Sequence, residues 1–159
     1  MTTVIHTQTH TRSLATRSTR STRCGDIIDA GIGWWRIQAR RPAIVLTVSG
    51  EIDASNTDRF SESAHRLIAV GDPIVVDLSG VDFFGVQAFR ALFSLDDDCR
   101  KAGVPWALVA GRGVRTLLRI GDCEGVLPVV SSVADALQQF QSQSPARRAP
   151  LVPLVSGAR

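Results

Sequence analysis

One stretch, residues 73–95, constrains what this chain can fold into more than any other part of the sequence. It begins with Ile74–Val76, a short apolar run rich in β-branched residues, which favours a buried strand over a helix. A break is expected at Ser79-Gly80, and Gly85 is an acceptable N-cap for a helix beyond it. In that helix, the apolar residues Val86, Phe89 and Phe93 recur three or four positions apart, with Ala88 and Leu92 beside them. We therefore expect a strand, a tight loop and a helix N-terminus, with the candidates for function gathered in the loop.

The rest of the chain alternates between the same two patterns. Further strands are expected over residues 33–39, 43–48, 105–110 and 126–130. Helices are expected after a cap at Ser55 or Asn56, from about 86 to 102, over 111–120, and after a cap at Ser131 or Ser132. This order predicts an α/β fold with a mixed sheet of about five strands and about four helices packed on it.

The two ends of the chain differ in composition from its middle. Residues 1–25 are mostly Thr, Ser, Arg and His and bury too little to offset their chain entropy, so a disordered tail is expected. One folded domain is expected over 26–142, followed by a flexible tail with prolines and arginines over 143–159. Seven of the 18 basic residues lie in the tails, which leaves 11 in the domain against all 15 acidic residues. This acidic domain argues against direct contact with nucleic acid.

Both tails carry motifs of their own. Hydroxyl side chains stand between arginines over residues 16–23, a pattern that suits a basophilic Ser/Thr protein kinase. The candidate phosphorylation sites are Thr2, Thr3, Ser18, Thr19, Ser21 and Thr22; the other interpretation is a solvated tail without modification. In the C-terminal tail, the apolar segment Leu151–Val155 indicates either contact with the domain's own surface or a docking peptide for a partner.

The sequence contains no constellation typical of an enzyme. Phosphate-binding glycine motifs and a nucleophile elbow are absent from it, and His65 is expected on a helix surface. We expect no catalytic residue, no cofactor and no metal site. Cys99 and Cys123 fall at predicted helix ends and form a candidate redox pair, against the simpler interpretation of reduced thiols. Without a run of ~20 apolar residues or a secretory h-region, the sequence predicts a cytoplasmic protein with no membrane span.

Three stretches resemble the STAS family (sulfate transporter and anti-sigma factor antagonist domains), and within it the antagonist type. They are V-S-G-E-I-D-A-S-N (Val48–Asn56), V-V-D-L-S-G-V-D-F (Val75–Phe83) and L-D-D-D-C-R-K-A-G-V-P-W-A-L-V (Leu95–Val109), in a resemblance that covers about residues 32–141. The resemblance implies a protein-binding domain that regulates sigma-factor-dependent transcription by partner switching. The unphosphorylated antagonist captures an anti-sigma factor, a kinase-like ATP-binding protein, and so frees a sigma factor. Phosphorylation of a serine at the N-terminus of the central helix ends the capture.

The sequence departs from this family pattern at the loop itself. Where the family continues with D-S-S-G, this chain has Gly85, Val86, Gln87 and Ala88, so that the phosphoacceptor serine matches Gln87. The resemblance still implies partner contacts at the loop and at a neighbouring turn: Asp53, Asn56, Asp82, Phe83, Phe84, Gly85, Val86, Gln87, Ala88 and Phe89. Three interpretations stay open: an antagonist whose control has moved to the N-terminal tail, a ligand-sensing or scaffold module of a larger assembly, and a degenerate paralogue that does not switch. A homodimer is also left open.

Overall fold

The computed structural model describes residue 25, residues 27–121 and residues 125–143. The predicted tails, 1–25 and 143–159, lie almost entirely outside these residues. Within them the elements follow in the order β1 (Ile27–Asp29), β2 (Gly33–Arg40), β3 (Ala43–Ile52), α1 (Thr57–Ile68), β4 (Ile74–Phe84), α2 (Val86–Ala102), β5 (Trp106–Val109), α3 (Arg112–Ile120), β6 (Val129–Val130) and α4 (Val133–Gln143).

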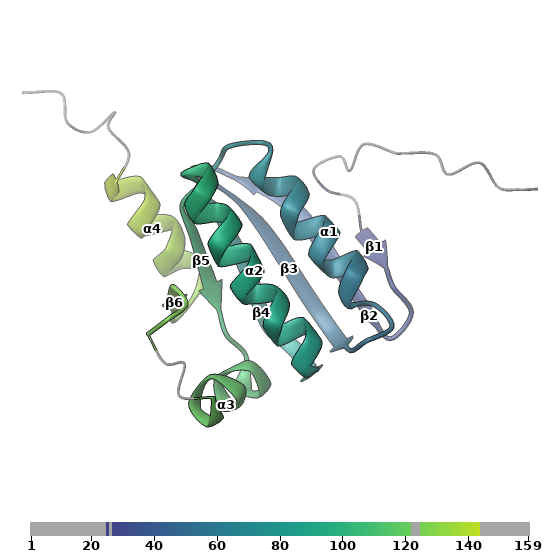
Figure 1. Ribbon diagram of the computed structural model, residues 1–159. Coiled ribbons are helices and arrows are strands. Elements are labelled where there is room, and N and C mark those ends of the chain that lie inside the picture. The colour runs from purple at the N-terminus through teal and green to yellow at the C-terminus, as the bar shows by residue number, and fades with distance from the viewer. Residues whose placement is uncertain (1–24, 26, 122–124, 144–159) are drawn as a thin grey trace, which may run out of the picture.

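The strands form one mixed sheet in the order β1-β2-β3-β4-β5-β6 (Figure 1). Strands β1, β2 and β3 pair antiparallel, whereas β3, β4, β5 and β6 pair parallel, with a helix between each two parallel neighbours. The predicted α/β class with a mixed sheet and about four helices is confirmed. Strand β1 was not predicted, because three residues are too few to show a pattern. The last strand is shorter than the predicted range 126–130.

Helices α1 and α2 cover one face of the sheet, as Figure 1 shows. Beneath them, Phe60 stacks edge to face between Trp35 and Phe84, with ring centroids 6.3 Å and 6.1 Å away. The Nε1 of Trp35 donates to Ser63 Oγ at 3.0 Å, so the polar group of this buried indole is satisfied inside the core. Burial of an aromatic side chain of this kind contributes about 1.5–3 kcal/mol. The aromatic row therefore fixes α1 against the end of β4.

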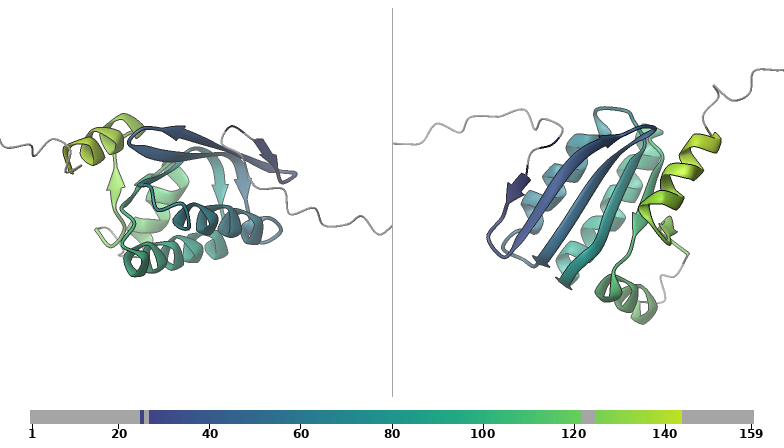
Figure 2. Two further views of the ribbon diagram at one scale, coloured as in Figure 1. Left: turned by 90° about the horizontal axis from the view of Figure 1, so that it is seen from above. Right: turned by 180° about the vertical axis from the view of Figure 1, so that it is seen from behind.

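The second face of the sheet is partly covered by α4 (Figure 2). Ala136 and Phe140 of α4 pack in a separate core cluster with small strand residues such as Val45 and Val75. Ser132 caps the helix, since its Oγ accepts a hydrogen bond from the N–H of Asp135 at 3.1 Å, and this confirms one of the two predicted caps. Seen from behind, much of β2 and β3 lies open beside α4.

Strand β4 is longer than the sequence indicates. It runs without interruption over Ile74–Phe84, so the expected break at Ser79-Gly80 is wrong. The register between β3 and β4 shifts twice near this point, which is the mark of bulges. Gly80 permits the close approach of the two strands, because a Cβ there would lie 2.6 Å from Ser49 Oγ. Asp77 accepts hydrogen bonds from the N–H and the hydroxyl of Ser79, at 3.0 and 2.6 Å. The strand is thus bent here instead of ended.

Helix α2 begins and ends where the sequence predicts. Gly85 precedes it with extended backbone, and Gly103 follows it in the left-handed region with φ of 67°. The buried stripe of the helix is formed by Ala88, Leu92, Leu95 and Cys99, whereas Val86 is exposed and Phe89 and Phe93 are half-buried. The helix is therefore rotated so that its first apolar side chain faces outward.

Candidate functional site

The candidate site lies where β4 ends and α2 begins. Side chains alternate between the two sides of a strand, so Phe83 points outward with 53% of its surface exposed while Phe84 is buried. The N–H of Gly85 donates to the carbonyl of Ile52 at 2.7 Å. The carbonyl of Gly85 accepts the N–H of Phe89 at 2.9 Å, which is the first hydrogen bond of α2. Main-chain bonds therefore hold the junction from both sides.

The neighbouring loop, between β3 and α1, is closed by Asn56. The Oδ1 of this buried side chain accepts the N–H of Asp53 at 3.0 Å, and its Nδ2 donates to the carbonyl of Glu51 at 2.9 Å. Asn56 precedes α1 as predicted, but its side chain makes no capping bond to the helix. Its polar groups instead fix the shape of the turn.

Asp53 organises the exposed part of the same loop. Its carboxylate accepts the hydroxyl of Ser55 at 2.6 Å and the N–H of Ser55 at 2.8 Å. Both bonds lower the pKa of the Asp53 carboxyl below its ordinary value, and the bond from the Ser55 hydroxyl has the larger effect. The side chain is therefore an anion at neutral pH, held in one position by its neighbour.

The two loops lie side by side and build one surface. A Cβ placed on Gly85 would lie 3.5 Å from the Cα of Asp53. Around this contact Asp82, Phe83, Val86 and Gln87 are exposed, Val86 to 62%. We refer to Asp82, Phe83, Gly85, Val86 and Gln87 as the knob. Two exposed apolar side chains on a backbone that is fixed by hydrogen bonds make this surface a candidate for contact with another protein.

Some of the expected contact residues do not reach this surface. Asn56, Phe84 and Ala88 are buried, so they support the knob from below and are not available to a partner. Phe89 is half-buried, and its ring stacks edge to face on Phe93 with centroids 5.2 Å apart. The burial of Ala88 could have been predicted from the sequence, because Ala88 lies four positions before Leu92 on the same helical stripe. The sequence does not show which of the adjacent residues Phe83 and Phe84 is buried.

The acidic run at the end of α2 pairs with bases of the same helix. The carboxylate of Asp96 forms an ion pair with Arg100 at 2.6 Å. It also accepts a hydrogen bond from the Nε1 of Trp106 in β5 at 2.9 Å. Asp97 pairs with Lys101 at 2.5 Å, and this hydrogen-bonded ion pair lowers the pKa of the Asp97 carboxyl. Among the residues that the structure describes, no group of three or more His, Cys, Asp or Glu is placed to hold a metal ion.

The remaining candidate residues contribute to the core or lie beyond the described part of the chain. Cys99 is buried, and burial together with Asp96 and Asp98 raises the pKa of its thiol to about 11. Cys123 lies outside the described residues, so the redox pair stays a prediction. The six candidate phosphorylation sites at 2, 3, 18, 19, 21 and 22, and the segment 151–155, also lie outside them.

His65 was expected on the helix surface and is instead half-buried between two helices. Its Nε2 lies 2.8 Å from Asp98 Oδ2, and its Nδ1 lies 2.7 Å from the carbonyl oxygen of Ser61. The contact with Asp98 joins α1 to α2, the two helices whose N-terminal ends frame the candidate site, whereas the contact with Ser61 lies within α1. His65 therefore has a structural role in this arrangement.

Comparison with known proteins shows to which family this domain belongs. The model of the STAS domain matches residues 35–136, which include both loops and the knob. The chain belongs to the STAS domain family. The chain is also similar over nearly its whole length to Osmosensory protein A of Mycobacterium tuberculosis. The two are 36% identical over 160 residues, which cover 98% of each chain. The anti-sigma-F factor antagonist RsfA of the same species is 32% identical over 105 residues, which cover 64% of this chain and 82% of RsfA.

Solved structures share the STAS fold. An anti-sigma factor antagonist from Mycobacterium paratuberculosis superposes with a TM-score of 0.63 at 22% identity, over 69% of this chain and 94% of that chain. The phosphorylated form of the Bacillus cell fate determinant SpoIIAA gives a TM-score of 0.54 at 11% identity, over 67% and 98%. Within the described ranges, no helix of the STAS domain has the length and apolar character to cross a membrane.

Proposed function

We propose that this chain is a cytoplasmic regulatory protein of the anti-sigma factor antagonist type and that it catalyses no reaction. It captures an anti-sigma factor, a kinase-like ATP-binding protein, and thereby frees a sigma factor for transcription. The knob, with Asp53 beside it, is the contact surface. The observation that carries this proposal is the exposure of Phe83 and Val86 on a junction whose backbone is fixed by hydrogen bonds to both neighbouring elements.

The rigid base of the knob supports a binding role. An interface gains affinity when the contact residues are already ordered, because less conformational entropy is lost on association. Here Gly85 is bonded to Ile52 and Phe89, and Asn56 closes the adjacent turn. Asp53 and Asp82 add carboxylates to the same surface as the exposed apolar side chains, which favours a partner that offers both basic and apolar groups.

Control by phosphorylation of the knob is not part of the proposal. The resemblance places the phosphoacceptor serine of the family at Gln87, whose amide cannot accept a phosphoryl group. We place the switch in the N-terminal tail, where a Ser/Thr protein kinase would add negative charge at one of the candidate sites named above. The similarity to Osmosensory protein A suggests osmotic stress as the signal that this kinase transmits.

The alternative proposal, a ligand-sensing or scaffold module, predicts a different partner. Affinity purification from the native host separates the two. An antagonist retains a kinase-like anti-sigma protein, whereas a sensor or scaffold retains a small molecule or a larger assembly. Repeating the purification without residues 1–25 tests whether the tail controls capture.

The contact surface itself is tested by truncating Phe83. A phenylalanine buries about 200 Å² when fully covered, so the exposed half of Phe83 offers about 100 Å² to a partner, worth about 2.5 kcal/mol. Phe83→Ala should therefore weaken binding of the anti-sigma partner by up to ~60-fold in a titration. Val86→Ala should weaken it by a few-fold.

Val70→Ala is the matched control for Val86→Ala. Val70 is 59% exposed, close to the 62% of Val86, but it follows the C-terminal end of α1, away from the knob. Its truncation should leave the affinity unchanged. Equal losses for the Val70 and Val86 variants, or none for Phe83→Ala, would place the contact surface elsewhere.

A further inference from the structure

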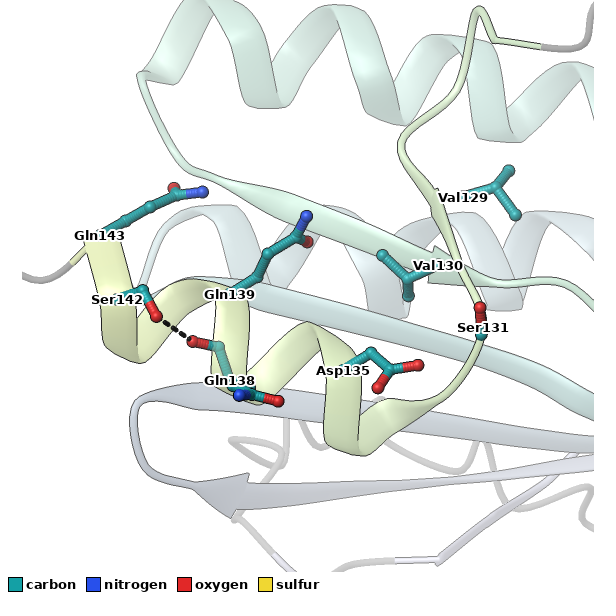
Figure 3. A pocket seen from close by; sticks show the side chains of 8 residues that line it. All are labelled: Val129, Val130, Ser131, Asp135, Gln138, Gln139, Ser142 and Gln143. Carbon is teal, nitrogen blue, oxygen red and sulfur yellow. Dashed lines mark hydrogen bonds between the residues drawn. The ribbon is translucent and has the colours of Figure 1, made fainter.

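A groove runs between α4 and the last strand of the sheet, at the end of the domain opposite to β1. It measures about 590 Å³ and is bounded on one side by Val129, Val130 and Ser131. On the other side, α4 presents one continuous stripe, with residues three or four positions apart: Asp135, Gln138, Gln139, Ser142 and Gln143. Figure 3 shows these side chains around the groove, with Val130 and Gln139 extending toward the same gap.

The strand wall of this groove has an open hydrogen-bonding edge. Strand β6 is the last of the sheet, with β5 as its strand neighbour among the described residues. Because the N–H of Leu108 donates to the carbonyl of Pro128 at 2.9 Å, alternation turns the carbonyl of Val129 and the N–H of Ser131 to the outer side. Val129 is also 40% exposed. An extended peptide could therefore add to this edge and cover an apolar side chain at the same time.

We propose that the groove between β6 and α4 holds the chain's own C-terminal segment Leu151–Val155, added to β6 as a short edge strand. The chain continues from Gln143, a residue of the groove's rim, with 16 further residues. The stripe from Gln143 back to Asp135 is about 12 Å long at the rise of a helix. The seven residues between Gln143 and Leu151 reach about 23 Å when extended, which is enough to turn and run back along it.

The composition of the tail matches the groove in two respects. Arg147 and Arg148 precede the apolar segment, and Asp135 is the charged side chain of the groove's lining. If Val152 and Leu154 turn their main-chain groups toward β6, Pro153 falls on the outer side, where its missing N–H loses no bond. The same proline then blocks pairing with a further strand, which is a known protection of sheet edges. Tethering favours this segment over free peptides, because its effective concentration at the groove is high.

The experiment compares the full chain with a chain truncated after Gln143. The proposal predicts that amide hydrogen exchange at Ser131 is slower by about tenfold or more in the full chain, and that the side-chain amide signals of Gln138 and Gln139 shift between the two forms. Val152→Asp with Leu154→Asp in the full chain should reproduce the spectrum of the truncated form. The matched control, Ser156→Asp with Ala158→Asp, adds the same charge outside the segment and should retain the protection.

A second arm adds a synthetic peptide of residues 144–159 to the truncated chain, where saturable shifts at Ser131 are expected. Identical exchange in the full and truncated chains would overturn the proposal. It would also be overturned if the protection depended on protein concentration and sedimentation showed a dimer, because the segment would then occupy the groove of a second copy.

Discussion

Replacement of Gln87 by glutamate should change folding stability and partner affinity in opposite directions. Gln87 is exposed in the first turn of α2, a turn that contains no acidic residue and whose N-cap Gly85 makes no side-chain bond. Since the first hydrogen bond of α2 comes from Phe89, the N–H groups of residues 86–88 have no acceptor within the helix. A carboxylate at this end stabilises a helix by about 0.3–1 kcal/mol. For a domain of this size, we expect the Tm to rise by about 1–5 °C.

The same carboxylate should weaken capture of the anti-sigma partner. If the knob is the contact surface, Gln87→Glu would bring an additional negative charge into an interface that already contains Asp82 and Asp53, and part of the hydration of that charge would be lost on binding. We expect a loss of at least ~1 kcal/mol, which is about fivefold in Kd. Gln87→Asp should act in the same direction.

Thermal denaturation and a binding titration on the same preparations separate the two effects. Gln87→Lys serves as the opposite charge change and should lower the Tm, since a cation is unfavourable at a helix N-terminus. If Gln87→Glu raises the Tm and leaves the Kd within a factor of two, the helix argument holds and the knob is not the contact surface. If the Tm falls, the description of the α2 N-terminus is wrong.

Three further predictions concern one residue that supports the site and two residues elsewhere in the domain. Asn56→Ala should lower the free energy of unfolding by about 2–4 kcal/mol in urea denaturation, because the N–H of Asp53 and the carbonyl of Glu51 lose their partner; a loss below ~0.5 kcal/mol would refute the role of Asn56. Gly111→Ala should cost about 1–3 kcal/mol in the same assay, since its Cβ would lie 2.5 Å from the Leu78 carbonyl oxygen, and an unchanged midpoint would contradict this. The pKa of the Cys99 thiol is raised from 9.0 to about 11 in the folded protein, so the free energy of unfolding should fall as the pH rises across that interval. In urea denaturation at several pH values, Cys99→Ala should make the free energy of unfolding less dependent on pH.

Local signals in the sequence were enough to predict where α2 begins and ends. The bounds of α2 match the prediction, because the N-cap at Gly85 and the left-handed Gly103 after the helix are decided by the backbone of a few residues. Strand β4 was misjudged for the opposite reason. Ser79-Gly80 has the composition of a turn, but pairing with β3 carries the strand through it, and the close contact with Ser49 that requires glycine comes from that distant strand.

The candidate site was likewise predicted only in part from the sequence. The sequence located it at the start of α2 but could not decide which side chains face outward. Phe83 and Phe84 are adjacent and identical in type, and the choice between them depends on Phe60 of α1, against which Phe84 packs. Likewise, the role of Asn56 depends on its two main-chain partners in the turn and not on the helix that it precedes. A contact between elements therefore decided which phenylalanine is buried, whereas the geometry of a single turn decided the role of Asn56.

The central claim is that the junction of β4 and α2 recognises another protein. Amide hydrogen exchange of the full chain, alone and in complex with its anti-sigma partner, tests it most directly. We predict slower exchange in the complex at residues 82–88 and in the turn at 53–56, with the open surface of β2 unchanged. Slower exchange confined to β2 or to α4, with residues 82–88 unaffected, would contradict the claim.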